Sequence, residues 1–210
     1  LTHRGTAGAE AVASSYTVSN AALGTAATGR VVVVGFFVGV SSGQITGVTV
    51  GGVSATSASH NSGNSSRLME IWYAVVPTGT TGDIVVSHNS TGVRYRIDWW
   101  TIHGSTQTTP SAVSDNPPKS ATSNTITSSS LTVPSGGCAI AVNYHNNASA
   151  GGETTWTISA GSINQRTDTR VGSGPWFTTA DTTQTGTITV TATNTQAAAL
   201  TQIAAIAWGP

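Results

Sequence analysis

The sequence predicts an all-β protein in which two antiparallel sheets form a jelly-roll-like β-sandwich built from two duplicated β-units. Three observations predict this fold. Short runs rich in Val, Ile and Thr recur along the chain, glycine-containing turns separate them, and the whole pattern occurs twice. Helical periodicity is nearly absent. Chains of many short strands and glycine turns form sandwiches or barrels.

The internal repeat is clearest around two aromatic pairs. Trp72 stands ten residues before Gly82, and Trp176 stands ten residues before Gly186. A strand-like run follows each of these glycines, and an apolar strand ending in glycine closes each half of the chain. The repeated positions are apolar or glycine positions, which build a scaffold. We therefore interpret the pattern as an ancient duplication of one β-unit.

Each unit is expected to contain six strands. In the first unit they lie near residues 15–19, 30–40, 45–58, 67–76, 83–88 and 93–103. The second unit repeats them near residues 125–133, 138–145, 155–166, 176–180, 187–193 and 200–208. The runs favour strands by composition, and clusters of Gly, Asn or Pro separate them. The Ala-rich run 200–208 is also compatible with a helix, but its match to residues 93–103 predicts a strand.

Two segments lie outside these units. Residues 1–14 are rich in Gly and Ala and are expected to form an N-terminal arm, either disordered or lying on a neighbouring subunit. Residues 105–123 contain three prolines and lack apolar periodicity, so we expect them to link pseudo-repeat 15–104 to pseudo-repeat 124–210.

The sequence leaves two arrangements of these units open. A sheet with one open face would expose a large apolar area, so we favour one sandwich over residues 15–210 whose halves share a core. Two small sandwiches in tandem are the alternative.

The composition excludes several classes of partner. Charged residues make up 8% of the chain, whereas about 25% is usual, and the net charge is zero. Lys119 is the only lysine and the arginines are scattered, so the basic stripe that binds nucleic acid or anionic membrane surfaces is missing. No apolar run approaches the length of a membrane span, so no membrane insertion is expected. Near-zero net charge weakens repulsion between copies and favours association.

Residue types that carry catalysis or bind metals are spread thinly. The five histidines lack the close pairing typical of metal sites, and the eight carboxylates form no cluster. Cys138 is the only cysteine, and its apolar surroundings predict a buried, inert thiol. We therefore predict a non-enzymatic protein with no catalytic residues, no metal and no cofactor.

One segment combines polar and aromatic residues more densely than any other. Because side chains alternate along a strand, Trp99 and Trp100 must point to opposite faces of the sheet. One of them is expected to face outward or into a second layer, where it could stack on a sugar ring or anchor a subunit contact. The predicted ligand or partner surface consists of Arg94, Tyr95, Arg96, Asp98, Trp99 and Trp100.

The pattern of core and turn residues resembles Gly/Ser/Thr-rich β-sandwich modules of phage virion proteins and bacterial surface proteins. The segments that carry the resemblance are 45–53 (ITGVTVGGV), 70–73 (EIWY), the turn 77–82, residues 104–110 and the closing 204–210. It covers most of the chain but includes no catalytic motif. The Trp99-Trp100 pair departs from it, because such modules tend to carry smaller apolar residues there.

The resemblance implies a virion, extracellular or cell-surface location and a structural or adhesive role. With the zero net charge, it predicts a non-enzymatic structural subunit of a virion or extracellular assembly, such as a capsid decoration, fibre or filament protein. Its partners would be copies of itself or other subunits of the assembly. The alternative is a carbohydrate-binding or adhesion module for surface glycans, with Trp99 or Trp100 and Tyr95 stacking on sugars.

Overall fold

The computed structural model describes all of residues 1–210 except 41, 60–66, 120–123, 147–152, 172–174 and 196–199. The protein is all-β, with antiparallel pairing between neighbouring strands. No helix among the described residues has the length and hydropathy needed to cross a membrane.

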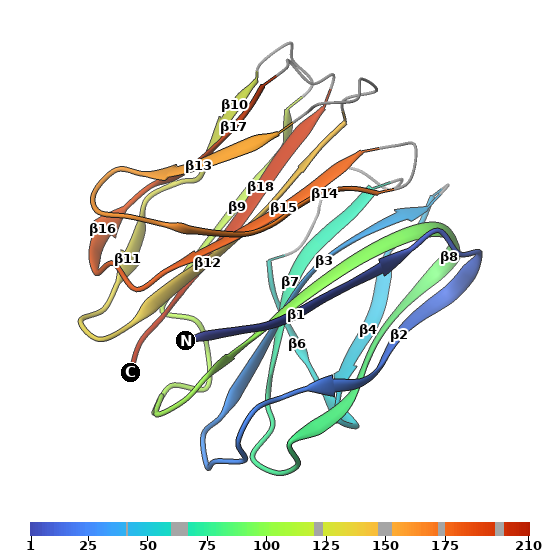
Figure 1. The fold of residues 1–210 in the computed structure, drawn as a ribbon, viewed down its shortest axis with the longest axis horizontal. Coiled ribbons are helices and arrows are strands. Elements are labelled where there is room, and N and C mark those ends of the chain that lie inside the picture. Colours follow the sequence, from blue (N-terminus) through green and yellow to red (C-terminus); the bar gives the residue numbers. More distant parts are fainter. Residues whose placement is uncertain (41, 60–66, 120–123, 147–152, 172–174, 196–199) are drawn as a thin grey trace.

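Eight strands come from the first half of the chain and form one sheet (Figure 1). They are β1 (Thr2–Ala9), β2 (Ala13–Ala22), β3 (Val31–Val40), β4 (Ile45–Val50), β5 (Val53–Ser54), β6 (Thr56–Ser59), β7 (Arg67–Val75) and β8 (Thr81–Ile102). Ten more strands follow. They are β9 (Ala112–Lys119), β10 (Thr125–Thr127), β11 (Leu131–Val133), β12 (Cys138–His145), β13 (Thr154–Ile158), β14 (Asn164–Arg170), β15 (Trp176–Thr182), β16 (Gly186–Ile188), β17 (Val190–Asn194) and β18 (Thr201–Trp208).

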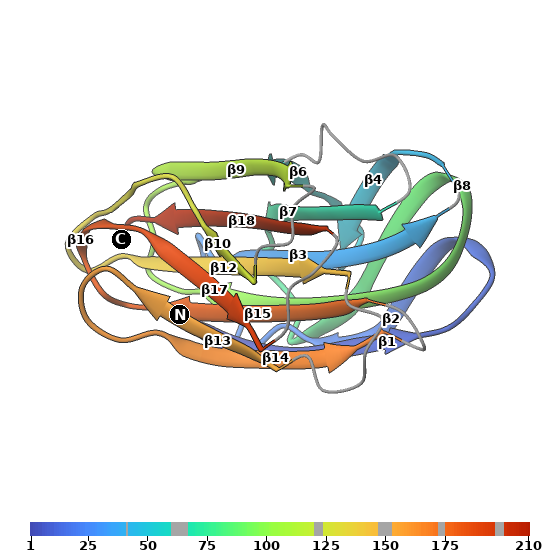
Figure 2. The ribbon, with the colours of Figure 1, turned by 90° about the horizontal axis from the view of Figure 1, so that it is seen from above.

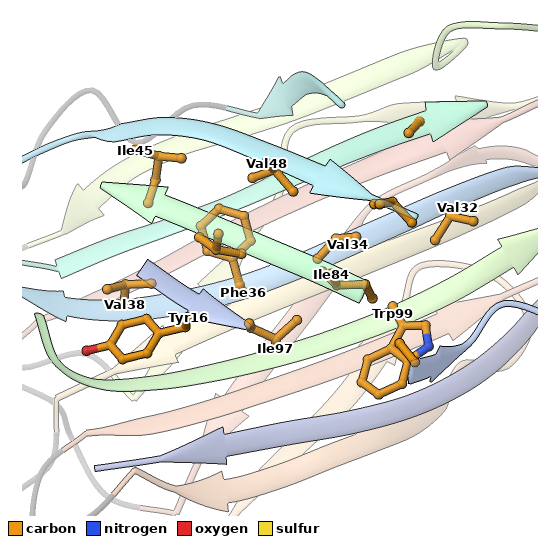
Figure 3. Packing of buried hydrophobic residues seen from close by; sticks show 14 of the residues in the cluster. Tyr16, Val32, Val34, Phe36, Val38, Ile45, Val48, Ile84, Ile97 and Trp99 are labelled. Atoms are coloured by element: carbon orange, nitrogen blue, oxygen red, sulfur yellow. The ribbon is translucent and has the colours of Figure 1, made fainter. Parts of the chain in front are cut away.

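The long strand β8 organises the first half. Its first part pairs with β2 and β4, and its second part pairs with β1 and β3. The eight-stranded sheet therefore curls around until it is nearly a barrel, and it encloses a buried cluster that includes Tyr16, Phe36, Ile84 and Trp99 (Figure 3).

Strand β3 is buried on both faces, which explains its unbroken apolar run. Val32, Val34 and Phe36 point into the core of the first half (Figure 3). Val33 and Phe37 point the opposite way, toward the second half of the chain. Alternation along one strand thus supplies two separate cores.

The second half contains three sheets. A five-stranded sheet has the order β14-β15-β12-β18-β9, a three-stranded sheet has the order β10-β17-β13, and β11 pairs with β16. The two smaller sheets cover one face of the five-stranded sheet and bury a cluster that includes Leu131, Trp156, Ile188 and Ile203.

The sheets of the two halves lie against each other (Figures 1 and 2), and a third buried cluster lies between them. Phe37 stacks on Tyr144 with ring centroids 4.9 Å apart, and Tyr73 meets the edge of Trp208 at 5.0 Å. A Cβ atom at Gly35 would lie 2.6 Å from Val142 Cγ1, so glycine lets the two sheets approach here. The buried apolar residues thus form three clusters, and this one is shared by the two halves.

The matched segments of the repeat occupy matching places in the two halves. The second part of β8, β3 and β7 are consecutive neighbours in their sheet, as β18, β12 and β15 are in theirs. The first part of β8 lies between β2 and β4, as β17 lies between β10 and β13.

The two segments expected outside the repeat are themselves strands. Residues 2–9, expected to belong to a free arm, form β1 along the second part of β8. Residues 112–119, expected to lie in a linker, form β9 along β18 in the corresponding place. Both are edge strands without an apolar run, so their pairing depends on a distant partner strand that periodicity does not reveal.

A buried arginine fixes the turns at one end of the first half. Arg30 is 0% exposed. Its Nε donates to Val76 O at 2.7 Å, its Nη1 to Gly24 O at 2.8 Å and its Nη2 to Thr78 O at 2.7 Å. One side chain therefore satisfies three loop carbonyls inside the protein.

Candidate functional site

The predicted surface lies on β8, where consecutive side chains alternate between two environments. Tyr95 and Trp99 face the core of the first half, where Tyr95 stacks on Tyr16 at 4.3 Å. Trp100 faces the second half and belongs to the cluster between the halves. The prediction that the two tryptophans point to opposite faces, one of them into a second layer, is confirmed.

The residues at even positions each bind the second half of the chain. Arg94 Nη1 donates to Val171 O at 3.2 Å, and Arg96 Nη2 donates to Arg170 O at 3.5 Å. Asp98 Oδ2 accepts a hydrogen bond from Thr179 Oγ1 at 2.7 Å. This row of polar side chains, together with Trp100, is called the joint below.

The joint has its strongest interactions at Asp181 on β15, which is 2% exposed. Trp100 Nε1 donates to Asp181 Oδ2 at 2.7 Å. Arg166 donates to the same carboxylate through Nε at 2.6 Å and Nη2 at 2.9 Å. This bidentate pairing raises the pKa of Arg166. A carboxylate with three charge-assisted donors is well satisfied inside a protein.

Burial changes the interpretation of the predicted surface. Asp98 and Trp100 are 0% exposed and Trp99 is 6% exposed, so these three residues cannot meet an external ligand. Tyr95 and Arg96 are half-buried, and so is Arg94. The polar side chains and Trp100 therefore serve the joint between the halves, and Tyr95 and Trp99 serve the core of the first half; the sequence could not distinguish these roles from an exposed surface.

An open cleft of about 300 Å³ lies at one end of the joint. It is formed by the end of β3, the middle of β8 and the start of β7, together with Asn146 and Pro175. Its described lining residues are Phe37, Gly39, Val40, Arg67, Val93, Arg94, Asn146 and Pro175. Only Arg94 belongs to the predicted set. Val93 is its neighbour in the sequence, and the other lining residues come from segments that sequence patterns do not bring together.

The cleft combines positive charge with apolar walls. Arg67 and Arg94 both lower the pKa of the Tyr144 hydroxyl electrostatically, although burial dominates and raises it above its ordinary value. Two guanidinium groups therefore act on the same small region. A Cβ atom at Gly39 would lie 2.9 Å from Arg94 Cγ, so glycine leaves room for this arginine against β3.

Exposed aliphatic side chains border the cleft. Val93 lines it and is 45% exposed. Ala11 N donates to Val93 O at 3.1 Å, which brings the following residue, Val12, to the same edge. Val12 is 77% exposed, more than any other large apolar side chain in the described part of the protein. An exposed valine pair beside an arginine is typical of a contact surface.

A second polar cluster joins two sheets of the second half. Thr154 N donates to Asp168 Oδ2 at 2.8 Å, and Thr154 Oγ1 donates to Asn194 Oδ1 at 3.0 Å. The same hydroxyl must then accept from His145 Nε2, 3.2 Å away, which fixes the proton of the neutral imidazole on Nε2. Burial lowers the pKa of His145 to about 4 and raises that of Asp168 to about 6.

Two further predictions concern cysteine and metals. Cys138 is buried, as predicted, and burial raises the pKa of its thiol to about 11. Among the described residues, no group of three or more His, Cys, Asp or Glu side chains is placed to hold a metal ion.

Comparison with known proteins adds no relative. No protein-family model matches the chain, and no curated protein or solved structure matches it.

Proposed function

We propose that this protein is a non-enzymatic structural subunit of a virion or extracellular assembly, and that it acts through protein–protein contacts. The observation that carries the proposal is the exposure of aliphatic side chains next to an arginine around the cleft. There, Val93 is exposed beside Arg94, and the exposed Val12 follows Ala11, whose N–H donates to Val93 O. Aliphatic and guanidinium groups with an adjacent recess have the chemistry of a contact surface between subunits.

The distribution of charge supports this proposal. Several of the few charged residues lie inside the protein, where Arg30 binds loop carbonyls and Asp181 binds Arg166. The exposed charged residues of the described part are Glu10, Asp83, Asp115, Glu153 and Arg166. Zero net charge and a sparsely charged surface allow copies of the chain to approach each other closely.

The finer architecture is part of the same proposal. We propose that each half is a duplicated sandwich-like unit with jelly-roll-like character, as the repeat around Trp72 and Trp176 suggests. The matching strand neighbours in the two halves support this origin. A duplicated scaffold with a rigid joint suits a building block whose role is to present surfaces.

The carbohydrate-binding alternative loses its main argument. It depended on an outward-facing Trp99 or Trp100, and both side chains are buried. No exposed aromatic ring among the described lining residues of the cleft takes their place, because Phe37 is only 1% exposed. We therefore keep contacts between protein subunits as the proposed role.

Site-specific photo-cross-linking tests the location of the contact. A photoreactive amino acid replaces Val12 in one variant and Val113 in a matched control, because Val113 is also exposed (45%) but lies on the edge strand β9. We expect cross-linked oligomers from the Val12 position and few or none from the Val113 position. Equal yields from both positions, or monomers only from Val12, would contradict the proposed contact surface.

A further inference from the structure

The cleft has the chemistry to recognise one kind of group on a partner. We infer that it binds a carboxylate side chain, Asp or Glu, from an acidic segment of the partner protein, with an aliphatic neighbour of that side chain resting on the exposed valines. The inference rests on the proposed function, because it assumes that the cleft end is a contact surface.

Charge is the first argument. Arg67 and Arg94 line the cleft, and no Asp or Glu is among its described lining residues. Arg94 is half-buried and donates one N–H to Val171 O, and it has no ion pair in the described structure. A guanidinium group carries five N–H donors, so Arg94 keeps donors in the geometry that pairs with a carboxylate.

The neighbouring carboxylate of the chain does not fill this role. Glu10 follows β1 and is exposed near Val93, in the middle of β8, yet it forms no ion pair with Arg94 in the structure. Arg96 lies further along the joint and is directed to Arg170 O. Arg94 thus has no carboxylate counterpart among the described residues, and a partner can supply one.

The shape and walls of the cleft favour a peptide over an acidic sugar. Phe37, Val40, Val93 and Pro175 give aliphatic or deeply buried aromatic surface, which suits the side chains that flank a carboxylate in a peptide. An open recess of about 300 Å³ is large enough for one or two residues. Asn146 adds an amide that can hydrogen-bond the peptide backbone.

A titration followed by nuclear magnetic resonance tests the inference on the unmodified protein. The probes are N-acetyl-aspartyl-valine amide, its asparaginyl analogue and D-glucuronate, added separately to isotope-labelled protein. We expect the aspartyl peptide to shift the backbone amides of Val93 and Arg94 and to bind about tenfold more tightly than the asparaginyl peptide, because a charge-assisted pair is lost in the latter. Equal binding of the two peptides, shifts confined to other regions, or binding of glucuronate alone would overturn the inference.

Matched variants locate the interaction. Arg94→Gln is expected to weaken binding of the aspartyl peptide by about tenfold. Arg4→Gln is the control, because Arg4 also makes a side-chain hydrogen bond, but to Thr101 near the C-terminal end of β8, away from the cleft. We expect the control to bind as the wild type does; an equal loss in both variants would overturn the inference. Should Arg94→Gln fail to fold, the comparison of the two peptides on the wild type still decides.

Failure of the inference and failure of the proposed function give different results. If the chain binds the aspartyl peptide at the cleft but forms no oligomer, the carboxylate site is supported and the proposed self-association is contradicted. If the chain cross-links through Val12 but binds the two peptides equally tightly, the contact surface is supported and the carboxylate site is contradicted.

Discussion

Removing the carboxylate of Asp181 should destabilise both halves of the protein, because the joint depends on it. Asp181 accepts hydrogen bonds from Trp100 Nε1 and twice from Arg166. In Asp181→Ala the indole N–H is left unpaired where Trp100 is 0% exposed. The Arg166 side chain is 35% exposed and can turn to water. We therefore expect a loss of about 3 kcal/mol in the free energy of unfolding, mostly from the buried donor and the lost charge-assisted bonds.

A double-mutant cycle separates the energy of the hydrogen bond between Trp100 and Asp181 from the energy lost through poorer packing. Trp100→Phe removes the donor while keeping an aromatic ring in the cluster between the halves. Because the unpaired N–H is then absent, Asp181→Ala should cost less in this background, with a coupling energy of about 1.5 kcal/mol. Trp100→Phe alone also leaves the Asp181 carboxylate bound to Arg166.

Urea denaturation followed by circular dichroism measures these free energies. We expect one transition for the wild type, since the two halves share a buried cluster, and one transition at lower urea for Asp181→Ala. Coupling below about 0.5 kcal/mol would refute the reasoning. So would a variant in which the second half unfolds early while the first half keeps its wild-type midpoint.

Two further predictions concern buried groups away from the joint. Arg30→Ala should lower the free energy of unfolding by about 3 kcal/mol, because it leaves three loop carbonyls without their donor; thermal denaturation measures this, and an unchanged midpoint would contradict it. The pKa of His145 is lowered to about 4, so its contribution to stability is present above pH 6.5 and is lost as the pH falls toward 4. The pKa of Asp168 is raised from 3.8 to about 6, so its contribution is present below pH 3.8 and is lost as the pH rises through 6. The two effects oppose each other between pH 7 and 4. Asp168→Asn should therefore unmask the destabilisation that His145 causes on acidification, about 3 kcal/mol. His145→Gln should make the protein more stable on acidification, by a smaller amount because Asp168 is only half-buried. Urea midpoints across this pH range check both signs, and parallel profiles for the wild type and the two variants would contradict them.

The sequence predicted the strands that carry an apolar or alternating pattern. The run at β3 is buried on both faces, and the Ala-rich run at β18 is a strand, as its match in the repeat predicted. The break expected between residues 88 and 93 was wrong, because β8 continues through it as one strand. Asn89 and Gly92 favour a turn locally, but Gly92 pairs with β2 and β3 and His88 pairs with β4, so the chain stays extended.

The candidate site shows where such reasoning ends. Arg94 was identified from its polar and aromatic neighbours, some of which proved to belong to the joint and the others, Tyr95 and Trp99, to the core of the first half. Local pattern cannot tell a polar strand face that meets solvent from one that meets another sheet. The cleft depends on Val40, Arg67 and Asn146, which come from separate segments and meet only because the ends of several strands converge.

Sedimentation velocity over a wide range of protein concentrations tests the central claim most directly. We expect the wild-type chain to associate reversibly as its concentration rises, because its net charge is zero and it exposes Val12 and Val93 beside the cleft. Val12→Asp should reduce this association, and Val113→Asp should leave it unchanged. A wild-type chain that stays strictly monomeric at the highest concentration, or an equal effect of the two substitutions, would contradict a subunit that acts through this surface.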